Sequence, residues 1–91
     1  MSHLQADNDE LLKRVRRIAG QVQAIERALQ AKADCGKTLH LVAATRGALN
    51  GLLEQIIEDH AQFHVADPDL SDAQRQQGVK ELLRAIRQYS K

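Results

Sequence analysis

The spacing of aliphatic residues constrains this chain more than any other feature of its sequence. Over three segments, apolar side chains recur at alternating steps of three and four, which places them along one side of a helix. No segment shows the two-residue alternation of a half-buried strand. We therefore predict an all-α fold with three helices, and the 91-residue length leaves room for one domain, residues 1–91.

The predicted helices differ in length. The first should run from about residue 7 to about residue 30, and its apolar seam is Leu11, Val15, Ile18, Val22, Ile25 and Leu29. The second should begin near Cys35 after a turn at residues 31–34, and its seam is Leu39, Val42, Leu49, Leu53, Ile56 and Phe63. After a linker at residues 65–70, Ser71 has the side chain of a helix N-cap. The apolar face of the third helix is Val79, Leu82, Leu83, Ile86 and Tyr89.

The core that one copy can build is thin. Hydrophobic residues make up 43% of the chain, but Phe63 and Tyr89 are its only aromatic ones. A chain this short buries a modest fraction of its surface, so apolar seams of this length predict that several copies pack together. The single cysteine cannot form a disulfide within the chain. No segment approaches the roughly 18 consecutive apolar residues of a membrane span, so we expect no membrane partner and a cytoplasmic protein.

The second helix indicates how two copies would pair. Cys35 and His60 lie 25 residues apart, about 37 Å along a continuous helix, so they cannot share one ion within a chain. In an antiparallel pair of these helices, the Cys35 end of one copy would approach the His60 end of the other. Gly47 and Gly51 each cost stability inside a helix, which close approach of the two backbones at a dimer axis would offset. The alternative is a kink or break at one of these glycines.

Histidine and cysteine residues form a candidate metal site. His60 and His64 are four residues apart and therefore lie on one face of a helix, where two imidazoles can bind one ion. Taken alone, such a pair is more often part of a solvated surface. Antiparallel pairing adds the thiolate of the second copy, and the first helix, folded back along the second, would bring His3 to the same place. The candidate ligands are His3, Cys35, His60 and His64.

Basic side chains on the first and third helices are candidates for DNA binding. Those on the first helix are Lys13, Arg14, Arg16 and Arg17, and those on the third are Lys80, Arg84, Arg87 and Lys91. An isolated basic stripe is usually a solvated face, but stripes repeated across an oligomer would neutralise many phosphates, with strongly salt-dependent affinity. Arg46 lies on the apolar seam, and we expect it to pair with an acidic partner near the dimer axis.

Two stretches carry a resemblance to a known family. They are RVRRIAGQV at residues 14–22 and AATRGALNGL at residues 43–52, and they occur together with Cys35 and His60. With these motifs the chain resembles the copper-sensitive operon repressor family, CsoR/RcnR, over nearly its whole length. The resemblance implies three-helix protomers that form antiparallel dimers, and two dimers that form a disc-shaped tetramer. It also implies binding to operator DNA in the absence of an effector.

The resemblance assigns four effector positions, which fall here on His3, Cys35, His60 and His64. Copper sensors of the family have cysteine in place of His64, and persulfide sensors have a second cysteine in place of His60. The nickel and cobalt branch has the set found in this chain, which implies Ni(II) or Co(II) as effector, although Zn(II) accepts the same ligands. The implied function is a repressor that leaves its operator on binding metal and derepresses a metal efflux or homeostasis gene. The amine of Ser2, once Met1 is removed, is a further candidate ligand.

A formaldehyde-sensing branch of the same family provides the alternative. It resembles this chain along residues 14–18, and its chemistry joins the cysteine thiol to the N-terminal amine. That branch typically has proline as its second residue and an acidic residue at the fourth effector position, where this chain has Ser2 and His64. A Ser2 amine could still react with a formaldehyde adduct on Cys35. The chain would then control formaldehyde detoxification genes.

Other classes of function fit the sequence less well. A metal-buffering protein could use the same site but would not need the clustered basic residues. The chain has no paired carboxylates, no nucleophile with a base and no phosphate-binding glycine loop, so we do not expect an enzyme. If the chain were a helical interaction protein without a metal site, Cys35→Ala would affect packing alone.

Overall fold

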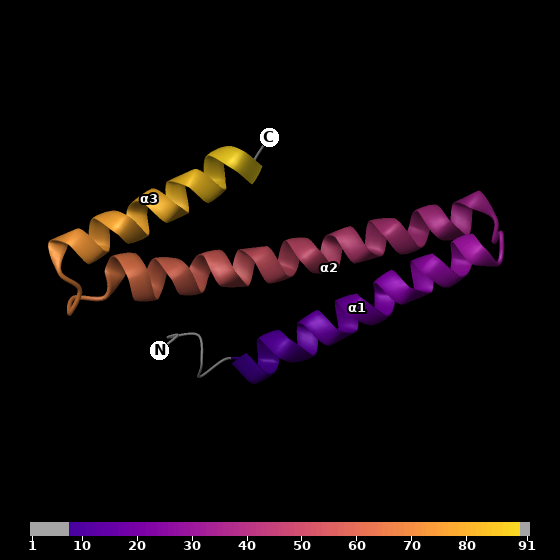
Figure 1. The fold of residues 1–91 in the computed structure, drawn as a ribbon, viewed down its shortest axis with the longest axis horizontal. Helices are drawn as coiled ribbons and strands as arrows, with labels where there is room; N and C mark the ends of the chain where they lie inside the picture. Colours follow the sequence, from indigo (N-terminus) through magenta and orange to yellow (C-terminus); the bar gives the residue numbers. More distant parts are fainter. Residues whose placement is uncertain (1–7, 90–91) are drawn as a thin grey trace. The chain divides into compact units, whose positions relative to one another are not determined.

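The computed structural model of the chain describes residues 8–89, which form three α-helices and one π-helical segment (Figure 1). The elements are α1 (Asn8–Gln30), α2 (Cys35–Ala61), the π-helical segment η2 (Gln62–Ala66) and α3 (Asp72–Tyr89). No strand occurs among the described residues, so the all-α prediction is confirmed there. Within the same range, no helix is long and apolar enough to cross a membrane.

The described residues fall into two compact units, which divide between Leu53 and Glu54 inside α2. In the first unit, α1 and the first part of α2 run antiparallel and side by side, joined by a short turn (Figure 1). In the second unit, α3 packs against η2. The candidate thiol of Cys35 belongs to the first unit, and the candidate histidines His60 and His64 belong to the second.

The end of α1 is closed by two backbone hydrogen bonds. The amide of Lys32 donates to the Leu29 carbonyl at 3.2 Å, and the amide of Ala33 donates to the Ala28 carbonyl at 2.9 Å. This pair of bonds is a Schellman motif, in which the residue just past the helix adopts the left-handed conformation. That residue is Lys32, with φ of 54°. The motif stops the helix and turns the chain toward α2.

The start of α2 is fixed by Asp34. Its Oδ1 accepts a 2.7 Å hydrogen bond from the amide of Lys37, which is the contact made by a helix N-cap. The amide of Thr38 also donates to the Asp34 carbonyl, at 3.2 Å. Cys35 therefore occupies the first position of α2, and the turn predicted at residues 31–34 is confirmed.

The middle of α2 contains the two glycines predicted at a dimer axis. The helix continues without interruption through Gly47 and Gly51, so the alternative of a break at these residues is wrong. A Cβ at either glycine would meet no heavy atom of another element within 4 Å. The neighbouring Arg46 is exposed. Gly47 is exposed in a single copy, whereas Gly51 is half-buried and faces α1, and their place at a dimer axis stays a prediction.

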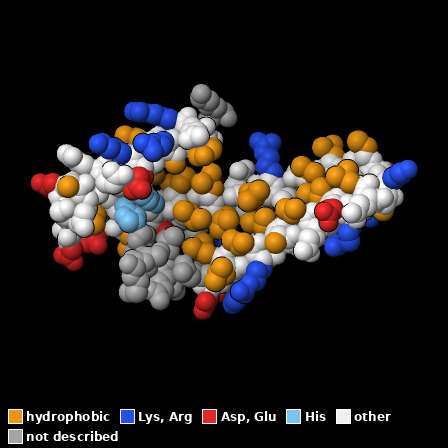
Figure 2. Space-filling model, in the orientation of Figure 1, with side chains coloured by type: hydrophobic (Ala, Val, Ile, Leu, Met, Phe, Trp, Pro, Cys, Tyr) orange, Lys and Arg blue, Asp and Glu red, His pale blue; other side chains and the backbone are white. Residues whose placement is uncertain are grey.

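Few apolar side chains are buried in a single copy. Among the described residues, the buried hydrophobic ones are Leu11, Ile18 and Ala28. Large hydrophobic side chains from every helix remain exposed, and Figure 2 shows them along α1 and α2. They are Leu12, Val15, Val22, Leu29, Leu39, Val42, Leu49, Leu53, Ile56, Phe63, Leu83, Ile86 and Tyr89. The predicted apolar seams are thus formed but largely uncovered.

The connection to α3 differs from the predicted linker at residues 65–70. Helical backbone persists through η2, and it ends at Asp67, which is extended (φ −61°, ψ 121°) because it precedes Pro68. The predicted N-cap is confirmed. The Gln74 amide donates to Ser71 Oγ at 3.1 Å, and the Ser71 amide donates to Gln74 Oε1 at 2.8 Å. This reciprocal pair is a capping box, which fixes the start of α3.

Candidate functional site

His60 and His64 lie side by side in the second unit. His60 is in the last turn of α2 and His64 is in η2, and their ring centroids are 4.7 Å apart with 30° between the ring planes. Both residues are half-buried. Nε2 of His60 lies 2.9 Å from the carbonyl oxygen of Gly78 in α3. The structure therefore brings together the two histidines that the sequence pairs.

A buried carboxylate precedes this pair in the sequence. Asp59 is 4% exposed, and its Oδ1 accepts a 3.0 Å hydrogen bond from Nε2 of Gln55. Its Oδ2 is buried without a hydrogen-bond partner, which is an unfavourable environment for a carboxylate oxygen. Asp59 has no distinguishing signal in the sequence, because an acidic residue near two other acids on a helix is usually solvated.

Two residues of α3, Arg75 and Gly78, hold the histidine segment, and neither was predicted from the sequence. Arg75 donates from Nη1 to the Val65 carbonyl at 2.6 Å and from Nη2 to the Leu70 carbonyl at 3.3 Å. Gly78 is buried, and a Cβ there would overlap the carbonyl oxygen of His64. A glycine inside an otherwise regular helix is the available sequence signal for such close packing. No comparable signal distinguishes Arg75 from its charged neighbours.

The remaining predicted ligands do not join this pair among the described residues. Cys35 is exposed and free of a disulfide at the start of α2. His3 lies outside the described residues. Within residues 8–89, no group of three or more His, Cys, Asp or Glu side chains could hold one ion. His60 and His64 are therefore half of a possible site, and a complete one needs further donors.

The donors that are present suit a transition metal. Imidazole nitrogens bind Ni(II), Co(II) and Zn(II), and a thiolate is a favourable additional ligand. Metal–nitrogen bonds are about 2.0–2.1 Å long for zinc, so a centroid separation of 4.7 Å keeps both rings within reach of one shared ion. His60 and His64 would hold such an ion from this chain. The pair is thus compatible with a first-row transition metal, and Ni(II) or Co(II) as the particular metal stays a prediction.

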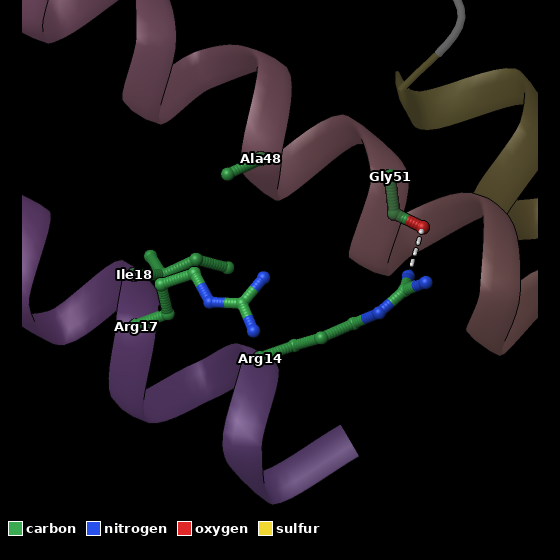
Figure 3. A pocket seen from close by; sticks show the side chains of 5 residues that line it. All are labelled: Arg14, Arg17, Ile18, Ala48 and Gly51. Atoms are coloured by element: carbon green, nitrogen blue, oxygen red, sulfur yellow. Dashed lines mark hydrogen bonds between the residues drawn. The ribbon is translucent and has the colours of Figure 1, made fainter. Parts of the chain in front are cut away.

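Arg14 and Arg17 of α1 line a cavity against α2 (Figure 3). The cavity has a volume of about 280 Å³, and its other lining residues are Ile18, Ala48 and Gly51. Nη1 of Arg14 donates a long, 3.4 Å hydrogen bond to the Gly51 carbonyl. Figure 3 shows the guanidinium of Arg17 directed toward the same space between the helices. Two positive charges therefore face one concave surface.

The other two basic residues predicted on α1 are exposed. Nζ of Lys13 lies 3.4 Å from a carboxylate oxygen of Glu10, and the two side chains are 64% and 77% exposed. An ion pair exposed to this degree contributes little to stability. Arg16 is also exposed. Both cations are therefore accessible to a charged partner.

The basic residues predicted on α3 form a stripe along one side of the helix. Lys80, Arg84 and Arg87 line one open groove together with Leu83 and Gln88. Figure 2 shows Lys and Arg side chains gathered over this helix. The last predicted member, Lys91, lies outside the described residues. The second unit thus carries both the imidazole pair and a basic surface.

The described helices of this chain thus carry an imidazole pair and two sets of exposed basic side chains. A family model described as metal-sensitive transcriptional repressor matches residues 7–88. The chain belongs to this family, which confirms the resemblance to the CsoR/RcnR repressors. Its members are transcriptional repressors rather than enzymes.

Two similar proteins match over their full length. An "uncharacterized protein in bioA 5′region" of Serratia marcescens is 45% identical over 91 residues, covering 100% of both chains. The transcriptional repressor RcnR of Salmonella paratyphi B is 33% identical, also over 100% of both chains.

A solved structure is similar as well. It is a glutamate-to-histidine variant of the formaldehyde-responsive regulator FrmR from Salmonella enterica serovar Typhimurium, with a TM-score of 0.88 and 39% sequence identity. The match covers 97% of this chain and 99% of that chain, which supports the three-helix fold. The chain thus matches a family of metal-sensitive repressors and is similar to a formaldehyde-responsive regulator, which leaves two classes of effector as candidates.

Proposed function

We propose that this chain represses transcription by binding operator DNA when metal-free, and that Ni(II) or Co(II) releases it from the operator. Release would derepress a metal efflux or homeostasis gene. The observation that carries the proposal is the imidazole pair of His60 and His64, with ring centroids 4.7 Å apart. Membership of a metal-sensitive repressor family supports a metal as the effector. Zn(II) would bind the same donors in vitro.

The proposed metal ligands are His3, Cys35, His60 and His64, with the Ser2 amine as a further candidate. Cys35 begins α2, and His60 lies in its last turn. In an antiparallel pair of α2 helices, the thiol of one copy would therefore meet the histidines of the other. A site shared in this way makes metal binding depend on the dimer.

The uncovered apolar seams support a homodimer and a homotetramer built from two dimers. Leu49 and Leu53 of α2 are 48% and 40% exposed in a single copy. Burying such aliphatic surface against another copy is favourable, and contiguous exposed apolar surface marks interaction sites. The missing side chains of Gly47, which is exposed, and of Gly51, which is half-buried, would let two α2 helices approach closely at the dimer axis. Arg46 would then find an acidic partner near the axis.

Operator DNA, in the cytoplasm, is the proposed partner of the basic residues. They are Lys13, Arg14, Arg16, Arg17, Lys80, Arg84, Arg87 and Lys91. Contacts from these side chains to phosphates would make the affinity fall steeply with salt. The concave surface that Arg14 and Arg17 share suits a phosphate group. Metal would release DNA by binding more tightly to a tetramer shape whose basic surfaces no longer fit the duplex.

Formaldehyde is the second candidate effector, favoured by the likeness to a formaldehyde-responsive regulator. The Cys35 thiol would add to formaldehyde to give an S–CH₂–OH group. Attack by the Ser2 amine would then form an S–CH₂–NH bridge and release water, with no oxidant or reductant consumed. This chemistry assigns no part to the imidazole pair, so His64 distinguishes the two candidates.

A release experiment tests the proposal. Ni(II), Co(II), Zn(II) and formaldehyde are titrated into the reduced, metal-free protein bound to its own upstream promoter DNA, and release is followed by fluorescence anisotropy. We expect release by Ni(II) or Co(II) that is lost in His64→Ala and kept in His40→Ala, since His40 is exposed elsewhere on α2. Release by formaldehyde alone, unaffected by His64→Ala, would instead establish the second candidate.

A further inference from the structure

The imidazole pair contacts α3 at one residue, Gly78. Nε2 of His60 lies 2.9 Å from the Gly78 carbonyl oxygen. On the same residue, an added Cβ would overlap the carbonyl oxygen of His64 and would lie 2.7 Å from its carbonyl carbon. Gly78 is buried, and its missing side chain is what allows α3 to lie against the backbone of η2. Both histidines therefore meet α3 at the same point.

The hydrogen bond from His60 fixes the position of its proton. A carbonyl oxygen can only accept, so Nε2 must carry the hydrogen and donate it to Gly78. In the neutral ring, the lone pair is then on Nδ1, which is the nitrogen available to a metal ion. A cation bound at Nδ1 would withdraw electron density and make Nε2–H a stronger donor. Metal binding would thus tighten the contact between His60 and α3.

Arg75 attaches the same face of α3 to the same segment. It lies three residues before Gly78 and donates to the carbonyls of Val65 and Leu70, at 2.6 and 3.3 Å. Residues three apart lie on one side of a helix, so Arg75 and Gly78 together define the side of α3 that docks on η2. This side of α3 is therefore held at two points, by the close packing of Gly78 on the His64 backbone and by the guanidinium of Arg75.

The basic stripe of α3 begins two residues beyond this contact. Lys80, Arg84 and Arg87 are carried on the same continuous helix as Gly78. A helix moves largely as a rigid element, so a shift or rotation at Gly78 repositions all three cations together. We infer that Gly78 is the residue through which a ligand on the His60–His64 pair is coupled to the DNA-binding surface of α3. This inference rests on the proposed repressor function and specifies how it is regulated.

Gly78→Ala, with Gly20→Ala as a matched control, tests the coupling. A Cβ at Gly20, in α1, meets nothing within 4 Å. For each protein, Co(II) affinity is measured by absorbance titration without DNA, and operator affinity by anisotropy with and without Co(II). The operator Kd with metal is measured at saturating Co(II), because a Cβ at Gly78 overlaps the backbone of His64 and a weaker Co(II) affinity must not be read as lost coupling. In Gly78→Ala we expect the ratio of operator Kd values with and without metal to fall by tenfold or more, as a lost coupling free energy requires. Gly20→Ala should keep both quantities.

The outcomes separate this inference from the proposed function. If the unmodified protein responds to metal and Gly78→Ala responds equally, the inference is wrong and the proposed function stands. If the unmodified protein does not respond to metal, the proposed metal response fails, and the coupling fails with it, whether or not formaldehyde releases the DNA.

A second measurement needs no variant, which matters if Gly78→Ala fails to fold. The ¹⁵N chemical shifts of the His60 ring in the metal-free protein report which nitrogen carries the proton. We expect the neutral ring to be protonated at Nε2, as the bond to Gly78 requires. Protonation at Nδ1 would overturn the inference even if metal released the protein from DNA.

Discussion

At the scale of single residues, the turn before Cys35 contains a backbone strain. Lys32 has φ of 54°, a conformation in which the Cβ of an L-residue crowds the following carbonyl. Glycine is the usual residue at this position of a Schellman motif because it has no Cβ. The hydrogen bonds that Lys32 and Ala33 donate at the end of α1 offset the free-energy cost of this conformation. The strain is local, so its removal should leave the rest of the fold unchanged.

Lys32→Gly should therefore raise the free energy of unfolding by about 1 kcal/mol, which is the cost of the left-handed conformation for a residue with Cβ. The greater flexibility of glycine in the unfolded chain offsets part of this gain. Urea unfolding at fixed protein concentration measures the difference. Lys37→Gly, in the first turn of α2, is the control and should lower stability instead. A loss of stability in Lys32→Gly would contradict this account.

At the scale of helices, local sequence signals predicted what depends on local structure. The end of the first helix, the turn at residues 31–34 and the cap at Ser71 all rest on contacts within a few residues, and each is found. The pairing of His60 and His64 followed from helical spacing in the same way. The π-helical segment, the docking role of Gly78 and the Arg75 contacts were missed, because they arise where α3 packs on η2. Such contacts join residues of different helical segments, and helical periodicity relates only residues within one segment.

Arg75→Lys tests how strongly this packing holds α3. Lysine keeps the charge but lacks the planar fork that reaches the carbonyls of Val65 and Leu70 together. A hydrogen bond to a charged group contributes roughly 1.5–3 kcal/mol, so we expect a loss of about 2 kcal/mol. Amide hydrogen exchange should also quicken in η2 and the first turns of α3. Arg84→Lys, an exposed residue of the basic stripe, should show neither effect.

At the scale of the whole molecule, stability and association belong together. A described core of Leu11, Ile18 and Ala28 is small for a chain that leaves so many large aliphatic side chains exposed. Surface of this kind is stabilising only when another copy covers it. For a protein whose folded state needs a partner, the unfolding midpoint depends on protein concentration. The melting temperature of this chain should accordingly rise with its concentration.

Leu49→Glu tests the association directly. Leu49 lies between Gly47 and Gly51 and is 48% exposed in a single copy, so a carboxylate there would lose its hydration at the proposed dimer axis, a cost that pairing with Arg46 does not fully offset. We expect sedimentation velocity to show a smaller species, with a lower melting temperature. Gln23→Glu adds the same charge on exposed α1 surface and should leave the oligomer intact. An unchanged sedimentation coefficient in Leu49→Glu would place the interface elsewhere.

The length of α2 has a genetic consequence. Because Cys35 begins this helix and His60 lies in its last turn, the proposed metal site takes its thiol from one copy and its imidazoles from the other. Cys35→Ala and His60→Ala homodimers would then each have no intact site. A mixed dimer of the two would have one, formed by the Cys35 of the second variant and the His60 of the first. Two alleles that are each unresponsive should therefore complement each other when they are expressed in the same cell.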